Sequence, residues 1–248
     1  MTALSVNINK VALIRNARDQ NKPDIIEFAK RCIEAGANGI TVHPRPDRRH
    51  ITFEDVELLS KTRNLKELNI EGNPFSESEN GYPGLISMVE KTKPTQVTLV
   101  PDNRIQKTSD HGWDLHRDAD RLLGVINKIQ RIGCRVSLFL DPDPTQIAIA
   151  KRLNVDRIEL YTEMFARAYE SGEYKECLNI FDQTARAAQD VGIGVNAGHD
   201  LNQSNLSTFC HHVKGIREVS IGHALISDAL VNGIKQTIHD YLDALKSS

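Results

Sequence analysis

The sequence places a dense group of basic and imidazole side chains directly after an apolar run. In GITVHPRPDRRHI, residues 39–51, the run GITV leads to His43, Arg45, Arg48, Arg49 and His50. Guanidinium groups bind phosphate oxygens through forked, charge-assisted hydrogen bonds, and imidazoles exchange protons near neutral pH. This stretch therefore predicts a site where a phosphorylated compound binds and undergoes proton transfer.

Other groups suited to acid–base chemistry stand at the ends of similar runs. Glu71 follows ELNI, Glu159 lies within RIELYT, and His199 ends GVNAGH. Several such groups around one substrate favour a reaction made of successive proton transfers over a single nucleophilic attack. The same kind of run also ends in further polar or turn residues, namely Asn7, Asn9, Lys10, Asp102, Asp141, Thr162, Gly222 and His223.

Short runs rich in β-branched residues alternate with longer helical patterns along the chain. Eight of them are typical of buried parallel strands, bounded by turn or charged residues. They cover residues 4–9, 39–44, 67–72, 96–101, 135–140, 157–162, 194–199 and 218–223. A length of 248 residues then gives about 31 residues per strand–helix unit, the size expected for a (β/α)8 TIM barrel.

The predicted fold is therefore of the α/β class, a single TIM-barrel domain spanning residues 1–248. In such a barrel the active site lies at the C-terminal ends of the strands, where the residues named above would meet. A doubly wound open sheet is the structural alternative, but no GxGxxG motif follows the first run.

Local signals mark several helices between the strands. Thr52 and Asp55 form a capping-box pattern, and Asp143, Pro144 and Gln146 look like a cap, a first-turn proline and a reciprocal partner. Helical periodicity covers residues 25–33, 115–129, 173–191 and 225–245.

A second anion-binding position is predicted after the last two strands. Segments 197–204 and 220–227 each run from a glycine turn into an expected helix start. Exposed backbone N–H groups and the helix dipole favour phosphate at such starts. The sequence thus predicts two anion-binding positions at one barrel mouth.

Composition argues against several other classes of protein. A net charge of −2 gives no basic field for nucleic acid or an anionic membrane. The first residues lack the apolar run of a signal peptide and no stretch approaches a membrane span, so a cytoplasmic protein is expected. The four cysteines are widely spaced without a CxxC pair, which favours neither a disulfide framework nor a zinc ribbon.

The motifs together resemble those of the pyridoxine 5′-phosphate synthase family. The match runs in order through VNIN…LIRNAR (6–18), GITVHPRPDRRHI (39–51), ELNIEG (67–72), LVPD (99–102), VNAGHDL (195–201) and SIGHALI (220–226). The resemblance implies a barrel enzyme of vitamin B6 synthesis that condenses 1-deoxy-D-xylulose 5-phosphate with 3-amino-2-oxopropyl phosphate. It also implies a homo-octamer that uses neither a metal nor an organic cofactor.

The resemblance further implies a role for each matched residue. His43 and Glu71 match proton acceptors, His199 matches the proton donor, and Glu159 matches a group that stabilises a transition state. The residues that would bind the aminoketone phosphate are Asn7, Arg18, Asp200, Gly222 and His223. Those that would hold the deoxyxylulose phosphate are Asn9, Lys10, Arg45, His50 and Thr108. Segment 102–112 would form a lid over them.

Two regions depart from the family pattern. The family reads Asn-x-Asp-His on its first strand, where this chain has Asn7, Ile8, Asn9 and Lys10, and it often has a glycine in place of Asp200. Asn9 keeps a hydrogen-bonding carbonyl without the charge, whereas Lys10 adds a fixed positive charge. These differences bear on how substrate lies near the first strand more than on the overall reaction.

Three alternatives to this function use the same residues. Lys10 permits a Schiff-base aldolase acting on a sugar phosphate, which borohydride trapping of a covalent adduct would reveal. A metal-dependent hydrolase is possible in principle because His43, Glu71 and His199 are acceptable ligand types, although the first strand lacks an HxH pair. The third alternative is a non-catalytic barrel that only binds a phosphate ligand, for which substrates would bind without turnover.

Overall fold

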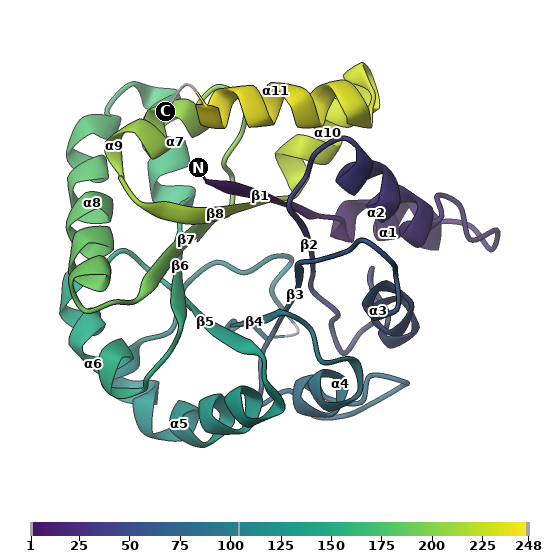
Figure 1. Cartoon of the computed structure of the whole chain (residues 1–248), viewed down its shortest axis with the longest axis horizontal. Helices are drawn as coiled ribbons and strands as arrows, with labels where there is room; N and C mark the ends of the chain where they lie inside the picture. The colour runs from purple at the N-terminus through teal and green to yellow at the C-terminus, as the bar shows by residue number, and fades with distance from the viewer. Residues whose placement is uncertain (1, 104, 247–248) are drawn as a thin grey trace.

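Eight parallel strands close on themselves in chain order, with β8 hydrogen-bonded to β1. The structure is a computed structural model that describes residues 2–103 and 105–246. The strands surround one axis and helices surround the strands (Figure 1), so the predicted TIM barrel is confirmed. The strands are β1 Ala3–Asn7, β2 Gly39–Val42, β3 Leu68–Gly72, β4 Gln96–Leu99, β5 Arg135–Leu140, β6 Arg157–Tyr161, β7 Gly194–Gly198 and β8 Ile216–Ile221.

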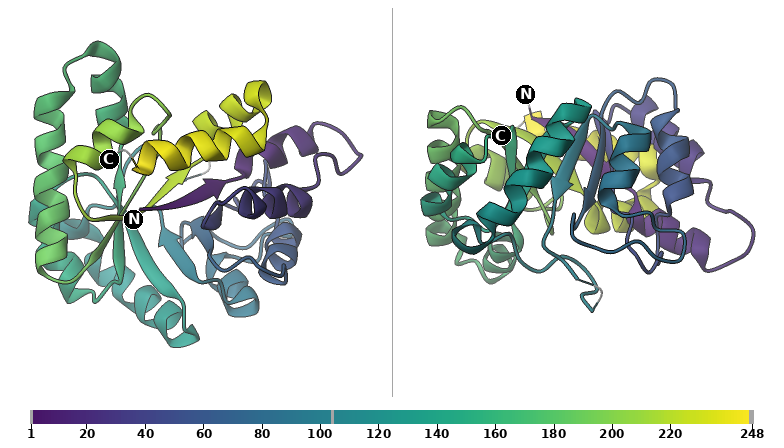
Figure 2. Two further views of the ribbon diagram at one scale, coloured as in Figure 1. Left: turned by 45° about the horizontal axis from the view of Figure 1, so that its top comes forward. Right: turned by 90° about the horizontal axis from the view of Figure 1, so that it is seen from below.

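The helices pack around the outside of the barrel (Figures 1 and 2). They are α1 Asn9–Asn16, α2 Ile25–Glu34, α3 Phe53–Ser60, α4 Leu85–Thr92, α5 Leu115–Ile132, α6 Ile147–Arg152, α7 Glu163–Ser171, α8 Tyr174–Asp190, α9 Leu206–His212, α10 His223–Asn232 and α11 Ile234–Lys246, with a 3-10 turn at Pro144–Gln146. None of the helices in residues 2–103 and 105–246 is long and apolar enough to cross a membrane.

The alternation of residue types along the strands places polar groups inside the barrel. In β1, Leu4 and Val6 are fully buried, and Ser5, which points the other way, bonds across the interior to Thr41 of β2 at 2.7 Å. The chain of bonds continues from Thr98 of β4 to Asn69 of β3 at 3.1 Å. Barrel interiors are more often filled by branched apolar side chains. Here the interior carries polar side chains up to the mouth.

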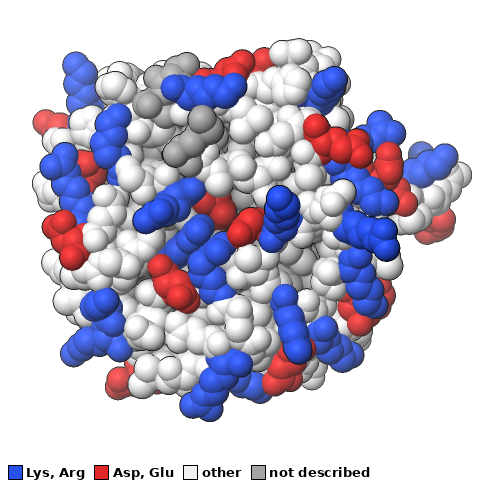
Figure 3. Space-filling model, in the orientation of Figure 1, with Lys and Arg blue, Asp and Glu red and all other residues white. Residues whose placement is uncertain are grey.

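The N-terminal face of the barrel is closed by charged side chains. Arg135 of β5 bonds to Glu67 at 2.7 Å, and Arg157 of β6 lies 3.5 Å from Glu218 of β8. Charges of both signs gather near the centre of this face, which is turned toward the viewer in Figure 3. The lid segment 102–112 lies at the opposite end of the barrel (Figure 2). Position 104 within it lies outside the described residues.

Several predicted boundaries and caps were wrong in detail. Asn9, expected at the end of the first strand, is the first residue of α1. The expected helix 225–245 is broken at Gly233, whose φ of +78° separates α10 from α11. The capping box of Thr52 and Asp55 is confirmed at α3. Asp143 accepts a bond from the Thr145 N–H as expected of a cap, but Gln146 is not its reciprocal partner.

Candidate active site

A cavity of about 410 Å³ opens at the C-terminal ends of the strands. Glu71 of β3 and His199, which follows β7, line it together although 128 residues separate them in the chain (71 to 199). The cavity collects all but one of the residues to which the family resemblance gives a role. These are Asn7, Asn9, Lys10, His43, Arg45, His50, Glu71, Thr108, Glu159, His199, Asp200, Gly222 and His223. Of the other residues named at strand ends or in the basic cluster, Asp102, Asp141, Thr162 and Arg48 do not line it.

His43, just beyond β2, lies between two carboxyl groups. Its Nδ1 is 3.5 Å from Glu71 Oε2, and its Nε2 is 3.2 Å from Asp102 Oδ2. Burial alone would lower the pKa of His43, but the charge of Asp102 and hydrogen bonds to Asp102 and Glu71 raise it to about 9. The Asn9 side chain accepts a bond from the His43 backbone N–H at 2.9 Å, which fixes the start of the loop.

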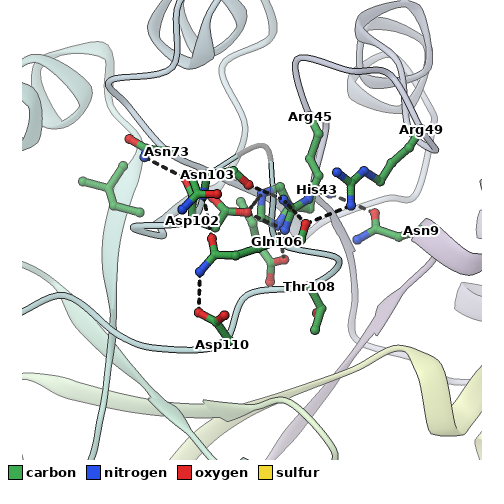
Figure 4. Close-up of polar contacts among 12 residues, drawn as sticks. Asn9, His43, Arg45, Arg49, Asn73, Asp102, Asn103, Gln106, Thr108 and Asp110 are labelled. Carbon is green, nitrogen blue, oxygen red and sulfur yellow. Dashed lines mark hydrogen bonds and ion pairs between the residues drawn. The ribbon is translucent and has the colours of Figure 1, made fainter.

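Two arginines of the β2 loop hold the lid segment. Arg45 lies 2.5 Å from Asp102 Oδ2 and donates to the carbonyl of Asn103 at 3.3 Å. Arg49 donates to the carbonyls of Gln106 and Lys107 at 2.9 and 3.2 Å. Figure 4 shows both guanidinium groups directed at the lid, with His43 and Asp102 beside them. Arg45 and Arg49 therefore line the cavity and also bond to carbonyl groups of segment 102–112.

His50 is buried beside the positively charged groups of the β2 loop. Burial, followed by the charges of His43, Arg45 and Arg49, lowers the pKa of His50 to about 3. The ring is therefore neutral over the physiological range. Within the described part of the chain, no group bonds to its buried Nδ1 atom. A neutral imidazole can donate or accept one hydrogen bond at a substrate without competing for its proton.

Glu159 of β6 lies at the floor of the cavity. Burial raises its pKa well above the usual range, and the charges of Glu71 and Glu218 raise it further. Thr98 lies 3.4 Å from its Oε2 atom. A Cβ atom at Gly198 would come within 2.4 Å of Glu159 Oε1, so only glycine leaves room for this carboxyl group. A carboxyl group kept protonated in this way can act as a hydrogen-bond donor.

The residues after β7 and β8 also line the cavity. His199 Nε2 is 3.0 Å from the lid residue Thr108, and its Nδ1 is 3.0 Å from Asp200. Gly222 packs so closely on Asn7 that a Cβ atom there would lie 3.1 Å from the Asn7 side chain. His223 is the first residue of α10, as the glycine-turn pattern predicted. The helix expected directly after β7 starts only at Leu206.

Arg18 is the one residue with a role implied by the family resemblance that does not line the cavity. It is exposed in the loop between α1 and α2, which projects from the body of the barrel (Figure 2). Arg48, from the basic cluster, also turns away and bonds to the Asn80 carbonyl at 3.0 Å. The basic cluster of the β2 loop therefore divides, with Arg45, Arg49 and His50 directed to the cavity.

Several residues that shape the site could not be assigned a role from the sequence. Asp102 was recognised as a strand-end carboxylate, but only the fold reveals that it contacts both His43 and Arg45. Phe139 and Tyr161 form an apolar part of the wall with ring centroids 5.3 Å apart. Their positions at the ends of β5 and β6 were the available signal.

The arrangement suits acid–base chemistry on an anionic substrate. His43, Glu71, Glu159 and His199 all line the same cavity. Among residues 2–103 and 105–246, no group of three or more His, Cys, Asp or Glu side chains is placed to hold a metal ion. The cavity thus combines several proton-transfer groups with cations that can bind phosphate.

Comparisons with known proteins agree with this description. The family model described as "Pyridoxal phosphate biosynthesis protein PdxJ" matches residues 4–247. Pyridoxine 5′-phosphate synthase of Xylella fastidiosa (strain M23) is 53% identical over 248 residues, covering 99% of this chain and 95% of the relative. The protein of the same name from Xanthomonas campestris pv. campestris (strain B100) is 51% identical over 243 residues, covering 97% of this chain and 95% of the relative.

Solved structures of low identity share the barrel. The 3-keto-L-gulonate-6-phosphate decarboxylase of Vibrio cholerae superposes with a TM-score of 0.63 at 10% identity, covering 99% of this chain and 97% of that one. Thiamine phosphate pyrophosphorylase of Pyrococcus furiosus gives a TM-score of 0.60 at 10% identity, with 99% and 95% covered. At such identities the likeness concerns the fold alone.

Proposed function

Because the chain belongs to the PdxJ family of pyridoxal phosphate biosynthesis proteins, we propose that it is a pyridoxine 5′-phosphate synthase. It is a transferase-type synthase that condenses 1-deoxy-D-xylulose 5-phosphate with 3-amino-2-oxopropyl phosphate. The products are pyridoxine 5′-phosphate, phosphate and water. The observation that carries the proposal is the meeting of His43, Glu71, Glu159 and His199 in one cavity, within a chain matched by the family model almost throughout.

The chemistry is a series of proton transfers that these groups can serve. The amine of one substrate attacks the ketone of the other, and loss of water gives an imine. Phosphate elimination, hydration, ring closure and aromatisation follow. We assign His43 and Glu71 as proton acceptors, since they lie 3.5 Å apart at the ends of adjacent strands, and His199 in the same cavity as the proton donor. Glu159, kept protonated by burial, stabilises a transition state from the cavity floor.

The two substrate phosphates require two groups of donors. We assign the deoxyxylulose phosphate to the side of the cavity formed by Asn9, Lys10, Arg45, His50 and Thr108. The aminoketone phosphate is assigned to Asn7 and to the turn at Gly222 and His223, where α10 begins directly at the cavity. Arg18 belongs to this second group by family resemblance, and it reaches the cavity only if its loop moves or if another copy of the chain supplies it.

A homo-octamer in the cytoplasm completes the proposal. Leu230 and Val231, at the end of α10, are 73% and 85% exposed, and burial against another copy would remove this apolar surface from water. Light scattering of the purified chain measures the mass directly. A monomer at micromolar concentration would contradict the octamer without bearing on the reaction.

The test of the reaction is to mix the purified chain with both substrates and to follow the fluorescence of the pyridine product. Product should form only when both substrates are present. Each substrate alone is the control. Binding of both substrates by calorimetry without any product would favour a non-catalytic barrel, and a borohydride-trapped adduct on Lys10 would favour the aldolase.

A further inference from the structure

The turn after β7 holds two residues in a backbone conformation that side chains rarely adopt. His199 and Asp200 have φ angles of +85° and +60°, in the left-handed region. The Thr162 hydroxyl lies between the carbonyl oxygens of Gly198, at 2.9 Å, and His199, and its one proton can be donated to either. Asn205 donates to the carbonyl of Asp200 at 3.2 Å. The turn is therefore fixed from both sides rather than left to fluctuate.

This backbone brings the Asp200 carboxylate onto the ring of His199. Oδ2 of Asp200 lies 3.0 Å from Nδ1 of His199. The hydrogen bond from His199 is the main reason that the pKa of Asp200 lies below its usual range, so the carboxyl group is ionised at neutral pH. A carboxylate can only accept a hydrogen bond, so Nδ1 carries a proton. Nε2 then faces the lid and the cavity, 3.0 Å from Thr108.

Neighbouring side chains hold the His199 ring in this orientation. Tyr161 packs edge-on against the His199 ring, with ring centroids 4.9 Å apart. The His199 side chain is only 19% exposed. Asp200, Tyr161 and Thr108 thus contact three sides of one imidazole. The carboxylate on Nδ1 is the arrangement that orients catalytic histidines in other enzymes.

We propose that Asp200 is a positioning residue that acts through His199. Its carboxylate holds the Nδ1 proton, directs Nε2 at the substrate, and stabilises the positive charge of the ring while Nε2 bears the proton to be donated. After transfer the proton is on the substrate, and the ring is neutral with Nδ1–H still bonded to Asp200. This inference rests on the proposed function, in which His199 is the proton donor.

The same geometry indicates that the Asp200 side chain does not bind a substrate phosphate. An ionised carboxylate repels a phosphate, and its oxygen is already bonded to His199. Any contact of this turn with the aminoketone phosphate therefore comes from the backbone. Removing the carboxylate should not weaken binding of either substrate.

Two substitutions test the inference without disturbing the turn. Glycine adopts a φ of +60° without strain and asparagine tolerates it, so Asp200→Gly and Asp200→Asn should both fold. Asp200→Gly removes the acceptor and the charge, whereas Asp200→Asn keeps an acceptor oxygen. Asp190→Asn is the matched control, because this exposed carboxylate at the end of α8 lies at the opposite end of the barrel.

We expect kcat of Asp200→Gly to fall about tenfold or more, part of what a positioned acid contributes, with Asp200→Asn between it and the parent. KM for both substrates should stay the same or fall. The Asp200 side chain is 43% exposed, so added formate can enter the vacated space and should restore part of kcat, whereas chloride at equal ionic strength should not. Asp190→Asn should match the parent.

The inference is overturned if kcat of Asp200→Gly stays within about twofold of the parent, or if KM rises while kcat is unchanged. Calorimetry with inorganic phosphate is run on the same variants and needs no turnover. Equal or tighter phosphate binding by Asp200→Gly supports the assignment, and weaker binding contradicts it. A parent chain that makes no product would count against the proposed function. The phosphate titration would still test whether the Asp200 side chain takes part in phosphate binding.

Discussion

Replacing Asp102 with asparagine should change the pH dependence of the reaction through His43. The carboxylate lies 3.2 Å from His43 Nε2, and its charge is the largest of the effects that raise the pKa of His43 from 6.5 to about 9. At about 1.4 kcal/mol per unit, this shift corresponds to roughly 3.5 kcal/mol in favour of the charged ring. In the parent, only about one ring in a hundred is neutral at pH 7 in the free enzyme.

The His43 ring must be unprotonated before it can accept a proton, so kcat/KM of the parent should rise with pH up to about 9. Asp102→Asn removes the charge but keeps the shape of the side chain. The ascending limb should move down by about one to two pH units, since Glu71 still contacts the ring.

The assay is kcat/KM for each substrate between about pH 5.5 and pH 10, a range that contains the parent's limb near pH 9 and the lower limb expected for the variant. Asp190→Asn is the control. Because Asp102 also contacts Arg45, KM for the deoxyxylulose substrate is compared at each pH. An ascending limb that stays in place in Asp102→Asn would refute the reasoning that Asp102 sets the protonation of His43.

Two further substitutions test how the site and the barrel are stabilised. The pKa of His50 in the folded chain is about 3, below its ordinary value of 6.5, so its contribution to stability is full above pH 6.5 and is lost as pH falls toward 3. In His50→Gln, the loss of unfolding free energy between pH 7 and pH 4 should be smaller than in the parent by up to about 3 kcal/mol, measured by urea denaturation; equal losses would contradict the assigned cause. Arg15 and Asp55 form a buried ion pair with one bond of 2.9 Å, so Asp55→Ala should cost about 3–5 kcal/mol in the same assay. The exposed pair of Glu27 and Arg31 is the control, and Glu27→Ala should cost less than about 1 kcal/mol; similar costs for the two variants would contradict the role of burial.

The barrel could be predicted because each strand carries its own signal. In β1 the alternation of Leu4, Ser5 and Val6 separates the face that packs on helices from the face inside the barrel. Thr52 and Asp55 likewise mark the start of α3 through contacts three residues apart. Both patterns involve residues close together in the sequence, so they can be recognised without knowing the fold.

The errors involve partners that are distant in the chain. Gln146 has a sequence position that suits a local cap, but its side chain accepts a bond from the Leu115 N–H at 2.7 Å. Asp102 is 59 residues from His43 (43 to 102), and no spacing rule connects them. Such contacts exist only once β2 and β4 have taken their places in the barrel. The role of Asp102 therefore required the fold.

In the candidate site, the position of a residue could also be predicted from the sequence, but its contacts could not. Once a barrel is predicted, strand-end residues such as Glu71 and His199 are expected at one mouth, and the structure brings them there. Neither the barrel rule nor the motif specifies which way a side chain turns. Asp200 turns to His199, and Arg48 turns to Asn80, for reasons of backbone conformation that are not visible in the sequence.

The most direct test of the account is turnover by Glu71→Gln. Glu71 Oε2 lies 3.4 Å from Asn7 Nδ2 and 3.5 Å from His43 Nδ1. Glutamine has the same size as glutamate, but its neutral amide is not a base at the pH of the assay. With both substrates, the account predicts a loss of product formation of about 100-fold or more, while calorimetry shows each substrate still binding as it does to the parent. Near-normal turnover by Glu71→Gln would contradict the claim that residues from separate strands act together as the acid–base groups of one reaction.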